Sequence, residues 1–168
     1  MKSKDFDGMN CSIATVMGAL GDRWGIMIMR DILLGLQRYD QLKQASPITH
    51  ATLSDRLKNL EMQGLIEKRL YQQRPERYEY IATEKGQDVA LVMLAMLQIG
   101  DKWKLQHSER PPLNFIHCDT GNPVQLQVVD AETENKLHFA QVNAVAGAGA
   151  DDLVLWRLEQ AKLYKDVS

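Results

Sequence analysis

The stretch THATLSDRLKNLEMQGLIEKRLY, from Thr49 to Tyr71, changes character once along its length. Its leucines at 53, 57 and 60 are spaced four and three residues apart, which places them on one buried side of a helix. Thr49 suits the N-cap of that helix, and Gly64 suits its end. After the glycine the residues alternate and turn basic, as in a strand. The stretch therefore predicts a helix with a small polar face, followed at once by a charged strand.

The face opposite the leucines carries mostly short polar side chains. The residues on or near this face are Ala51, Thr52, Asp55, Lys58, Asn59 and Met62. A helix that enters the major groove of DNA needs such a face, because bulky apolar groups would be stranded in water and could not read base edges. A solvated helix surface is the alternative interpretation. Asp55 is unusual for groove binding, since phosphates repel a carboxylate unless it accepts a hydrogen bond from cytosine N4 or pairs with an arginine.

A second strand is predicted over Arg77–Ala82, after a polar tip that contains a turn proline. The hairpin formed by the two strands carries four basic residues: Lys68, Arg69, Arg74 and Arg77. A basic hairpin beside a groove-binding helix can reach phosphates, which fix position without reading sequence. The alternative is a turn that only keeps the protein soluble.

Further helices are predicted on both sides of this stretch. Three precede it, over Ser12–Leu20, Trp24–Leu34 and Tyr39–Ala45, and a long one begins after Thr83 and runs to about Gln106. Helices, hairpin and long helix in this order indicate a winged helix-turn-helix of the α+β class. The long helix is apolar over a wider arc than one neighbour covers, so it is either deeply buried or packs against a second chain.

The character of the sequence changes after Arg110. Pro111-Pro112 marks a predicted boundary between a winged helix-turn-helix domain over residues 10–107 and a C-terminal extension over residues 111–168. In the extension we expect three strands and one helix, over Leu113–His117, Val124–Val129, Lys136–Val142 and Asp151–Tyr164. Dimerisation, an effector site and contact with another protein are the roles open to it.

The composition is that of a soluble globular protein, with 45% apolar and 25% charged residues. The net charge is −2, but ten Lys and Arg face six Asp and Glu from Arg23 to Tyr78, against ten and sixteen elsewhere. The middle of the chain is therefore basic and its flanks acidic. No secretory signal or membrane-spanning run is found, and two cysteines make no disulfide framework. We expect a cytoplasmic protein with no membrane partner.

The motifs of the chain resemble those of the HxlR-type winged helix-turn-helix transcriptional regulators, which are relatives of the MarR group. The similarity covers roughly residues 10–103 and rests on Cys11 and on the segments GDRWGIMIMRDILLG, RYDQL, LSDRLKNLEMQGLIEKRLY and PERYEYIATEKG. It implies a dimeric bacterial regulator that binds a pseudo-palindromic double-stranded DNA operator. Ser12 stands where the family usually has proline, and Ala82-Thr83 where it usually has Leu-Thr.

Cys11 matches the position of a family cysteine that senses oxidants in some members, so the resemblance makes it a redox-sensing candidate. Such chemistry needs thiolate character and exposure. The alternative is a small apolar residue at a dimer seam. The run His117-Cys118-Asp119 matches no zinc-site spacing, and no metal or other cofactor is expected.

The complete set of candidate DNA-binding residues is Thr49, His50, Ala51, Thr52, Asp55, Arg56, Lys58 and Asn59 in the helix, with Lys68, Arg69, Arg74 and Arg77 in the hairpin. Arg56 lies at the edge of the buried stripe, where it either contacts phosphate or holds a neighbouring helix. The leading hypothesis is a homodimeric, sequence-specific transcriptional regulator that responds to a small-molecule effector or an oxidant. A protein-interaction module that keeps the scaffold without binding DNA is the alternative. An enzyme is not expected, because no glycine-rich phosphate loop or spaced nucleophile and base is present.

Overall fold

The computed structural model describes residues 6, 8–103 and 110–165. The chain divides into two compact units, of which one spans residues 15–126 and the other combines the residues before Thr15 with those after Leu126. This division differs from the predicted boundary at Pro111-Pro112, since residues 110–126 pack with the first unit. The Gln98 carboxamide of the long helix explains this attachment, because it donates to the Leu126 carbonyl oxygen and accepts from the Leu126 N–H.

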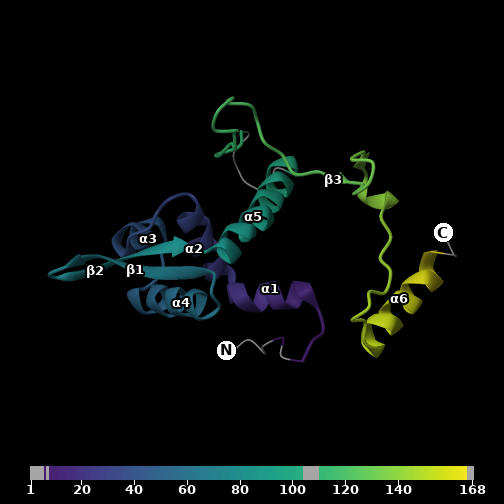
Figure 1. The fold of residues 1–168 in the computed structure, drawn as a ribbon, viewed down its shortest axis with the longest axis horizontal. Coiled ribbons are helices and arrows are strands. Elements are labelled where there is room, and N and C mark those ends of the chain that lie inside the picture. Colours follow the sequence, from purple (N-terminus) through teal and green to yellow (C-terminus); the bar gives the residue numbers. More distant parts are fainter. Residues whose placement is uncertain (1–5, 7, 104–109, 166–168) are drawn as a thin grey trace. The chain divides into compact units, whose positions relative to one another are not determined.

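The first unit has the element order of a winged helix-turn-helix (Figure 1). In chain order it contains α1 (Ser12–Leu20, whose first turn falls in the other unit), α2 (Arg23–Leu33), α3 (Tyr39–Ala45), α4 (His50–Met62), β1 (Ile66–Gln73), β2 (Glu76–Ala82) and α5 (Glu84–Lys102). These bounds confirm the predicted helices and strands. The predicted last turn of the long helix, to Gln106, lies outside the described residues.

The core of this unit forms where α4 packs against α2. Leu53, Leu57 and Leu60 of α4 are 0%, 2% and 0% exposed, and Ile28 and Met29 of α2 are 1% and 0% exposed. The predicted leucine stripe is therefore confirmed. Full burial of one such side chain contributes about 1.5–3 kcal/mol. This packing fixes the orientation of α4 and turns its opposite face outward.

The end of α4 is fastened to the start of α5. Gly64, which follows α4, has a φ of +69°, a left-handed conformation that glycine adopts without strain. The hydroxyl of Thr83 donates to the Gly64 carbonyl oxygen at 2.7 Å and, as the N-cap of α5, accepts from the Gly86 N–H at 3.1 Å. A Cβ at Gly86 would lie 1.9 Å from the Leu65 carbonyl oxygen, so only glycine allows this approach.

The two strands form an antiparallel hairpin that runs from the Ile66–Ala82 pair to the Gln73–Glu76 pair, with an irregularity between Leu70 and Gln72. Its tip projects beyond the neighbouring helices (Figure 1). An isolated bridge between Arg38 and Glu79 attaches the chain before α3 to β2. The hairpin is therefore anchored at its base and open at its tip.

The second unit contains less strand than the sequence predicts. It consists of β3 (Val128–Val129) paired with β4 (Lys136–Leu137), a 3-10 turn η1 (Phe139–Gln141) and α6 (Asp152–Lys165). The predicted strand over Val124–Val129 forms only at Val128–Val129, and the one over Lys136–Val142 forms only at Lys136–Leu137. Leu113–His117 contributes one bridge, from Ile116 to Pro123. Within the described residues β3 and β4 pair only with each other, and a two-stranded ribbon alone is marginally stable. The predicted terminal helix is confirmed.

The apolar stripe of α5 is not deeply buried within this chain. Val92, Met96, Ile99 and Trp103 are 37%, 51%, 55% and 66% exposed. Deep burial, one of the two predicted explanations for a broad apolar stripe, therefore does not hold for these four residues within the described part of the chain. No helix in the described part of the chain is long and apolar enough to cross a membrane.

Candidate nucleic-acid interface

The first turn of α4 is shaped by its cap. The Thr49 hydroxyl accepts a hydrogen bond from the Thr52 N–H at 3.1 Å, and the two threonine hydroxyls lie 2.9 Å apart. One of the backbone donors that a helix leaves unpaired at its start is thereby satisfied. The predicted cap at Thr49 is confirmed. Both hydroxyls are engaged in the cap, which fixes the position from which the helix starts.

His50 is held by α3. Its ring is stacked on Tyr39 with centroids 5.8 Å apart, and its Nδ1 lies 3.1 Å from the Tyr39 hydroxyl. The same hydroxyl lies 3.2 Å from Ser54 Oγ and donates to the His50 carbonyl oxygen at 3.1 Å. Tyr39 therefore ties α3 to the first turn of α4. Tyr39 was not among the candidates predicted from the sequence, although its place in the RYDQL motif was a usable signal.

Arg56 is bonded to the start of α2. Its Nε and Nη2 lie 3.0 Å and 2.8 Å from Asp22 Oδ2. Asp22 Oδ1 caps α2 by accepting from the N–H groups of Trp24 and Gly25. Burial by itself would raise the pKa of Asp22, but the hydrogen bonds from Arg56 and these N–H groups outweigh it and lower the pKa below 3.8. Arg56 was predicted either to contact phosphate or to hold a neighbouring helix, and this contact corresponds to the second role.

Asn59 also contacts a neighbouring helix of the same unit. Its Nδ2 lies 3.5 Å from the Ala19 carbonyl oxygen, and a Cβ at Gly21 would lie 3.1 Å from the same nitrogen. The side chain is half-buried. Arg56 and Asn59, three positions apart, thus form a stripe of α4 that packs on the junction between α1 and α2.

The remaining candidates on α4 form an open face. We define this open face as Ala51, Asp55 and Lys58, which are spaced by four and three residues and are all exposed. Neither the carboxylate of Asp55 nor the ammonium of Lys58 makes an ion pair within the described residues. The open face therefore presents one small apolar group, one carboxylate and one ammonium to a partner. Thr52 lies half-buried at its edge.

Two of the four basic residues of the hairpin are bonded within it. Lys68 Nζ lies 3.9 Å from the centre of the Tyr78 ring, a cation–π contact. Arg69 Nε lies 2.7 Å from Oε1 of Glu79, its direct partner across the strands. Both side chains remain exposed. Because hairpin groups partly compensate their charges, Lys68 and Arg69 attract a polyanion less strongly than unpaired cations would.

The other two, Arg74 and Arg77, are exposed at the tip of the hairpin and make no ion pair within the described residues. The neighbouring acid, Glu76, is held instead by the Tyr78 hydroxyl, which donates to Oε2 at 2.8 Å. That hydrogen bond raises the pKa of Tyr78. The Gln72 carboxamide braces the turn by donating to the Arg74 and Pro75 carbonyl oxygens at 3.0 Å and 3.2 Å.

A polar groove of about 420 Å³ lies between the start of α3 and the hairpin. Arg38, Lys68 and Arg77 bring three positive charges to it, and the guanidinium of Arg38 lies 4.8 Å from the centre of the Tyr71 ring. Asp40 and Glu76 contribute the opposing charges. Arg38 was not among the candidates from the sequence, because its contact with the hairpin arises only in the folded chain.

Cys11 precedes α1 and is half-buried. Its N–H donates to the Met9 carbonyl oxygen at 2.9 Å, and the carboxamide of its neighbour Asn10 donates to the Gly149 carbonyl oxygen at 2.7 Å. The described residues contain no disulfide, and Cys118 is exposed. Cys11 thus directly follows a residue that bonds the start of the chain to the C-terminal extension.

The ligand atoms of His117, Cys118 and Asp119 lie within 4.8 Å of one another on an exposed turn. His117 Nδ1 already accepts from the backbone N–H groups of Asp119 and Thr120, at 3.3 Å and 3.4 Å. Protein zinc sites use four ligands, or three and a water in a shaped cavity. Three consecutive exposed groups do not reach that arrangement.

A comparison with known families agrees with this geometry. The model described as HxlR-like helix-turn-helix matches residues 19–108. The chain belongs to the HxlR-like helix-turn-helix family. The matched residues run from α1 across α4 and the hairpin, so the family assignment covers the candidate interface.

Relatives in this family are transcription regulators, as the sequence predicts, and not enzymes. An uncharacterized HTH-type transcriptional regulator of Mycobacterium tuberculosis (strain H37Rv) is 30% identical over 138 residues, which cover 82% of this chain and 87% of the relative. A solved structure from Pseudomonas aeruginosa, described as a transcription factor, superposes with a TM-score of 0.60 at 32% identity and covers 88% of this chain and 100% of its own. The redox regulator HypR, in its oxidized form, matches at 25% identity with a TM-score of 0.51, over 55% of this chain and 96% of its own.

Proposed function

We propose that this HxlR-like protein is a homodimeric, sequence-specific DNA-binding regulator of transcription. In this proposal α4 reads base edges in the major groove, and the β1–β2 hairpin, which we call the wing, contacts the adjacent phosphates. The observation that carries the proposal is the pairing of the open face of α4 with the two exposed arginines of the wing tip, Arg74 and Arg77. Both belong to the unit that the family model matches.

The proposed contacts divide into two kinds. Ala51, Asp55 and Lys58 meet base edges or groove walls, because they form the exposed stripe opposite the core. Arg74 and Arg77 at the wing tip and Arg38 bind phosphate and set the register without reading sequence, and Lys68 and Arg69, which are partly compensated within the hairpin, contribute less. Thr49, His50, Thr52, Arg56 and Asn59 support the orientation of α4 through the hydrogen bonds described above.

Dimerisation is proposed through α1 and α5. Val16 and Met17 of α1 are 42% and 52% exposed, and the apolar stripe of α5 is open as well. An apolar groove of about 280 Å³ runs between the two helices. Burying these side chains against a second copy removes apolar surface from water. A dimer also matches the two-fold symmetry of operators, whose half-sites lie about 34–36 Å apart.

The contact between the start of α5 and the end of α4 connects the proposed dimerisation with the proposed DNA binding. Because Thr83 and Gly86 hold the first turn of α5 against Gly64 and Leu65, we expect α4 to move together with α5. A signal that changes how two α5 helices pack would then change the spacing of the two recognition helices.

Oxidation of Cys11 is one such proposed signal. It is supported by the likeness to HypR, a redox regulator, and by the contact between Asn10 and the extension. The test compares DNA binding by the wild type and by Cys11→Ser, each reduced and after treatment with the thiol oxidant diamide. A change of affinity in the wild type alone is expected. An equal change in both proteins would exclude Cys11 as the sensor.

The alternative function is a protein-interaction module that uses the winged-helix scaffold without DNA. The observations that favour it are the exposed Asp55 on the open face and the modest basic excess of the middle of the chain. A mobility shift at low salt with the DNA upstream of the protein's own gene separates the two functions. We expect a discrete complex that resists competition by unrelated DNA. Absence of binding at every salt concentration would leave the interaction module as the function.

A further inference from the structure

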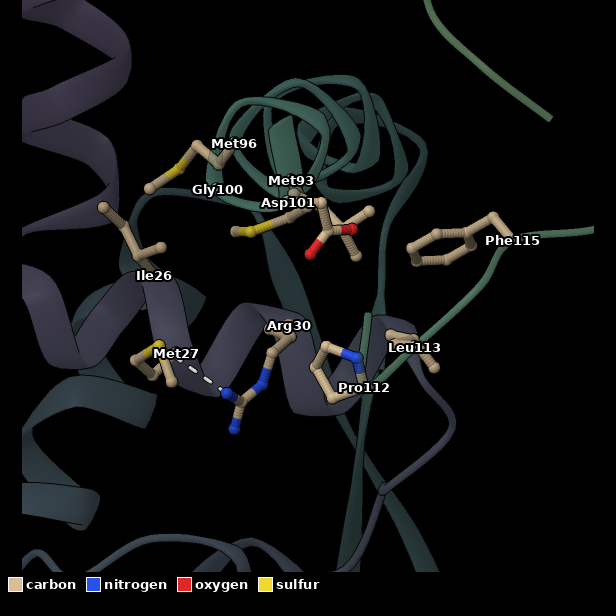
Figure 2. Close-up of a pocket in the computed structure, with 11 residues that line it drawn as sticks. Ile26, Met27, Arg30, Met93, Met96, Gly100, Asp101, Pro112, Leu113 and Phe115 are labelled. Atoms are coloured by element: carbon tan, nitrogen blue, oxygen red, sulfur yellow. Dashed lines mark hydrogen bonds between the residues drawn. The ribbon is translucent and has the colours of Figure 1, made fainter. Parts of the chain in front are cut away.

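A pocket of about 350 Å³ opens between α2, α5 and the segment that follows residue 110 (Figure 2). Its apolar wall comes from these three parts of the chain: Ile26 and Met27, Met93 and Met96, and Leu113 and Phe115. Small-molecule sites in proteins are concave, mainly apolar and about 300–1,000 Å³ in volume. The pocket is therefore at the lower end of the size range of such sites and has their composition.

The part of the pocket wall that follows residue 110 is held in place by hydrogen bonds. The Phe115 carbonyl oxygen accepts from the Val124 N–H at 2.9 Å, and the His117 N–H donates to the Asn122 carbonyl oxygen at 2.8 Å. The same segment is bonded to α5 through Gln98 and Leu126. It follows residue 108, where the family match ends, so this wall is not part of the shared family model.

The positive charge that lines the pocket is already paired. Arg30, which reaches into the pocket from α2, bonds Asp31 Oδ1 through Nε at 2.8 Å and Nη2 at 2.7 Å. Asp31 is 4% exposed, so this ion pair neutralises the guanidinium from inside the protein. Asp101, the other charged group of the lining, also has an interaction of its own. An anionic ligand would therefore meet a guanidinium that is already paired with Asp31.

Within the described residues the Nη1 donor of Arg30 has only a weak acceptor. Its Nη1 lies 3.7 Å from the sulfur of Met27, and a thioether accepts hydrogen bonds poorly (Figure 2). A ligand carbonyl oxygen in place of the sulfur would be a better acceptor. Met27, Met93 and Met96 can adjust to a flat ring, because methionine is flexible and its sulfur makes favourable contacts with aromatic edges.

We infer that this pocket binds an uncharged aromatic small molecule that carries one carbonyl or similar acceptor, with its ring among the methionines and its acceptor on Arg30. The role of the ligand rests on the function proposed above. Since α2 packs on α4 and α5 is fastened to the end of α4, a molecule wedged between α2 and α5 changes the orientation of the recognition helix.

The test uses the full chain and the uncharged naphthalene ketone Prodan, whose emission shifts to the blue in an apolar site. Gly100→Leu fills the pocket, because Gly100 lines it and a Cβ there meets no atom within 4 Å. Leucine also favours the helix over glycine by roughly 0.5–1 kcal/mol, so the variant is expected to fold. Ala90→Leu adds the same side chain to an exposed site of α5 that does not line the pocket and is the matched control.

We expect saturable Prodan binding by the wild type and by Ala90→Leu, and a loss of about tenfold or more in affinity for Gly100→Leu. Arg30→Lys keeps a positive charge beside Asp31 but removes Nη1, so a smaller loss is expected. Equal binding to the wild type and to Gly100→Leu would overturn the proposal. Tighter binding of the anionic dye anilinonaphthalene sulfonate than of Prodan would overturn the assignment to uncharged ligands.

The same proteins are then tested for DNA affinity with and without Prodan. A change in the wild type that is absent in Gly100→Leu supports the signalling role. Prodan binding is measured without DNA, so failure of DNA binding would count against the proposed function and not against the pocket. If the wild type does not bind Prodan and Gly100→Leu shifts the oligomeric state, the pocket belongs to the interface between copies and the ligand proposal is wrong.

Discussion

Arg56 in α4 and Asp22 at the start of α2 lie 34 positions apart in the chain and are joined by two hydrogen bonds, from Nε and Nη2 to Oδ2. The same carboxylate caps α2 through its other oxygen. One side chain thus organises the start of one helix and the orientation of another. The proposed recognition helix is therefore oriented by a polar contact as well as by its leucines.

Removing this contact is expected to affect stability more than DNA contacts. Asp22→Ala loses the cap and the ion pair and should destabilise the protein by about 1–2 kcal/mol. Arg56→Ala leaves the cap and, because the pair is partly exposed, should cost about 0.5–1 kcal/mol. Urea unfolding of the two single variants and the double variant measures the coupling between the residues. If Arg56→Ala leaves stability unchanged but lowers the salt dependence of DNA binding, Arg56 contacts phosphate instead.

The same contact predicts a loss of stability in acid. The folded-state pKa of Asp22 lies below 3.8, so its contribution is complete well above that value and is lost as the pH falls through the folded-state pKa. Asp22→Asn keeps a good capping side chain without the charge. Urea midpoints measured from pH 6 to about pH 3 should fall more steeply for the wild type than for Asp22→Asn. Parallel curves would show that this carboxylate contributes nothing to the acid sensitivity.

Arg74→Ala and Arg77→Ala should each weaken DNA binding across all sequences. If each guanidinium contacts one phosphate, the slope of log affinity against log salt flattens by about one unit per variant. Arg69→Ala is the matched control, because Arg69 is already paired with Glu79. We expect a smaller change for it. Unchanged slopes for both tip variants would rule out phosphate contacts at the tip of the wing.

Asp55→Ala tests the acid on the open face of α4. If Asp55 accepts a hydrogen bond from a cytosine N4, the variant should lose about 1–3 kcal/mol of discrimination at one base pair of the operator. Affinity for unrelated DNA should rise at the same time, because a negative charge near the phosphates is removed. Binding to the operator and to its single-base variants measures both effects. Tighter binding to every sequence by one common factor would show that Asp55 only repels DNA.

Ile99→Asp should disrupt the proposed dimer. Ile99 is 55% exposed on the apolar stripe of α5, and a carboxylate there would be buried without a partner in a dimer. Sedimentation velocity should show a dimer for the wild type and a monomer for the variant. Leu34→Asp is the control, since Leu34 is 45% exposed but follows α2 and lies on neither α1 nor α5. Dissociation by both substitutions, or by neither, would contradict dimerisation through α5.

The winged-helix part of the fold could be predicted because its signals are local. Apolar spacing, the threonine caps and the glycine after α4 each act within a few residues, and they placed the helices and strands of this part close to their observed bounds. The extension was harder to predict, since its apolar runs resemble strands but the described residues supply almost no pairing partners. Strand formation depends on such partners, and a single sequence does not show them.

For the candidate site, what the sequence predicts and what only the folded structure decides can both be seen in α4. The sequence by itself determined that α4 has a leucine side and a polar side, that a basic hairpin follows it, and that the chain resembles HxlR-type regulators. Only the tertiary structure separated the polar residues, with Arg56 and Asn59 turned to α1 and α2, and Ala51, Asp55 and Lys58 left open. The physical reason is that helical spacing fixes directions around one axis, whereas which direction meets another helix depends on contacts between residues far apart in the chain.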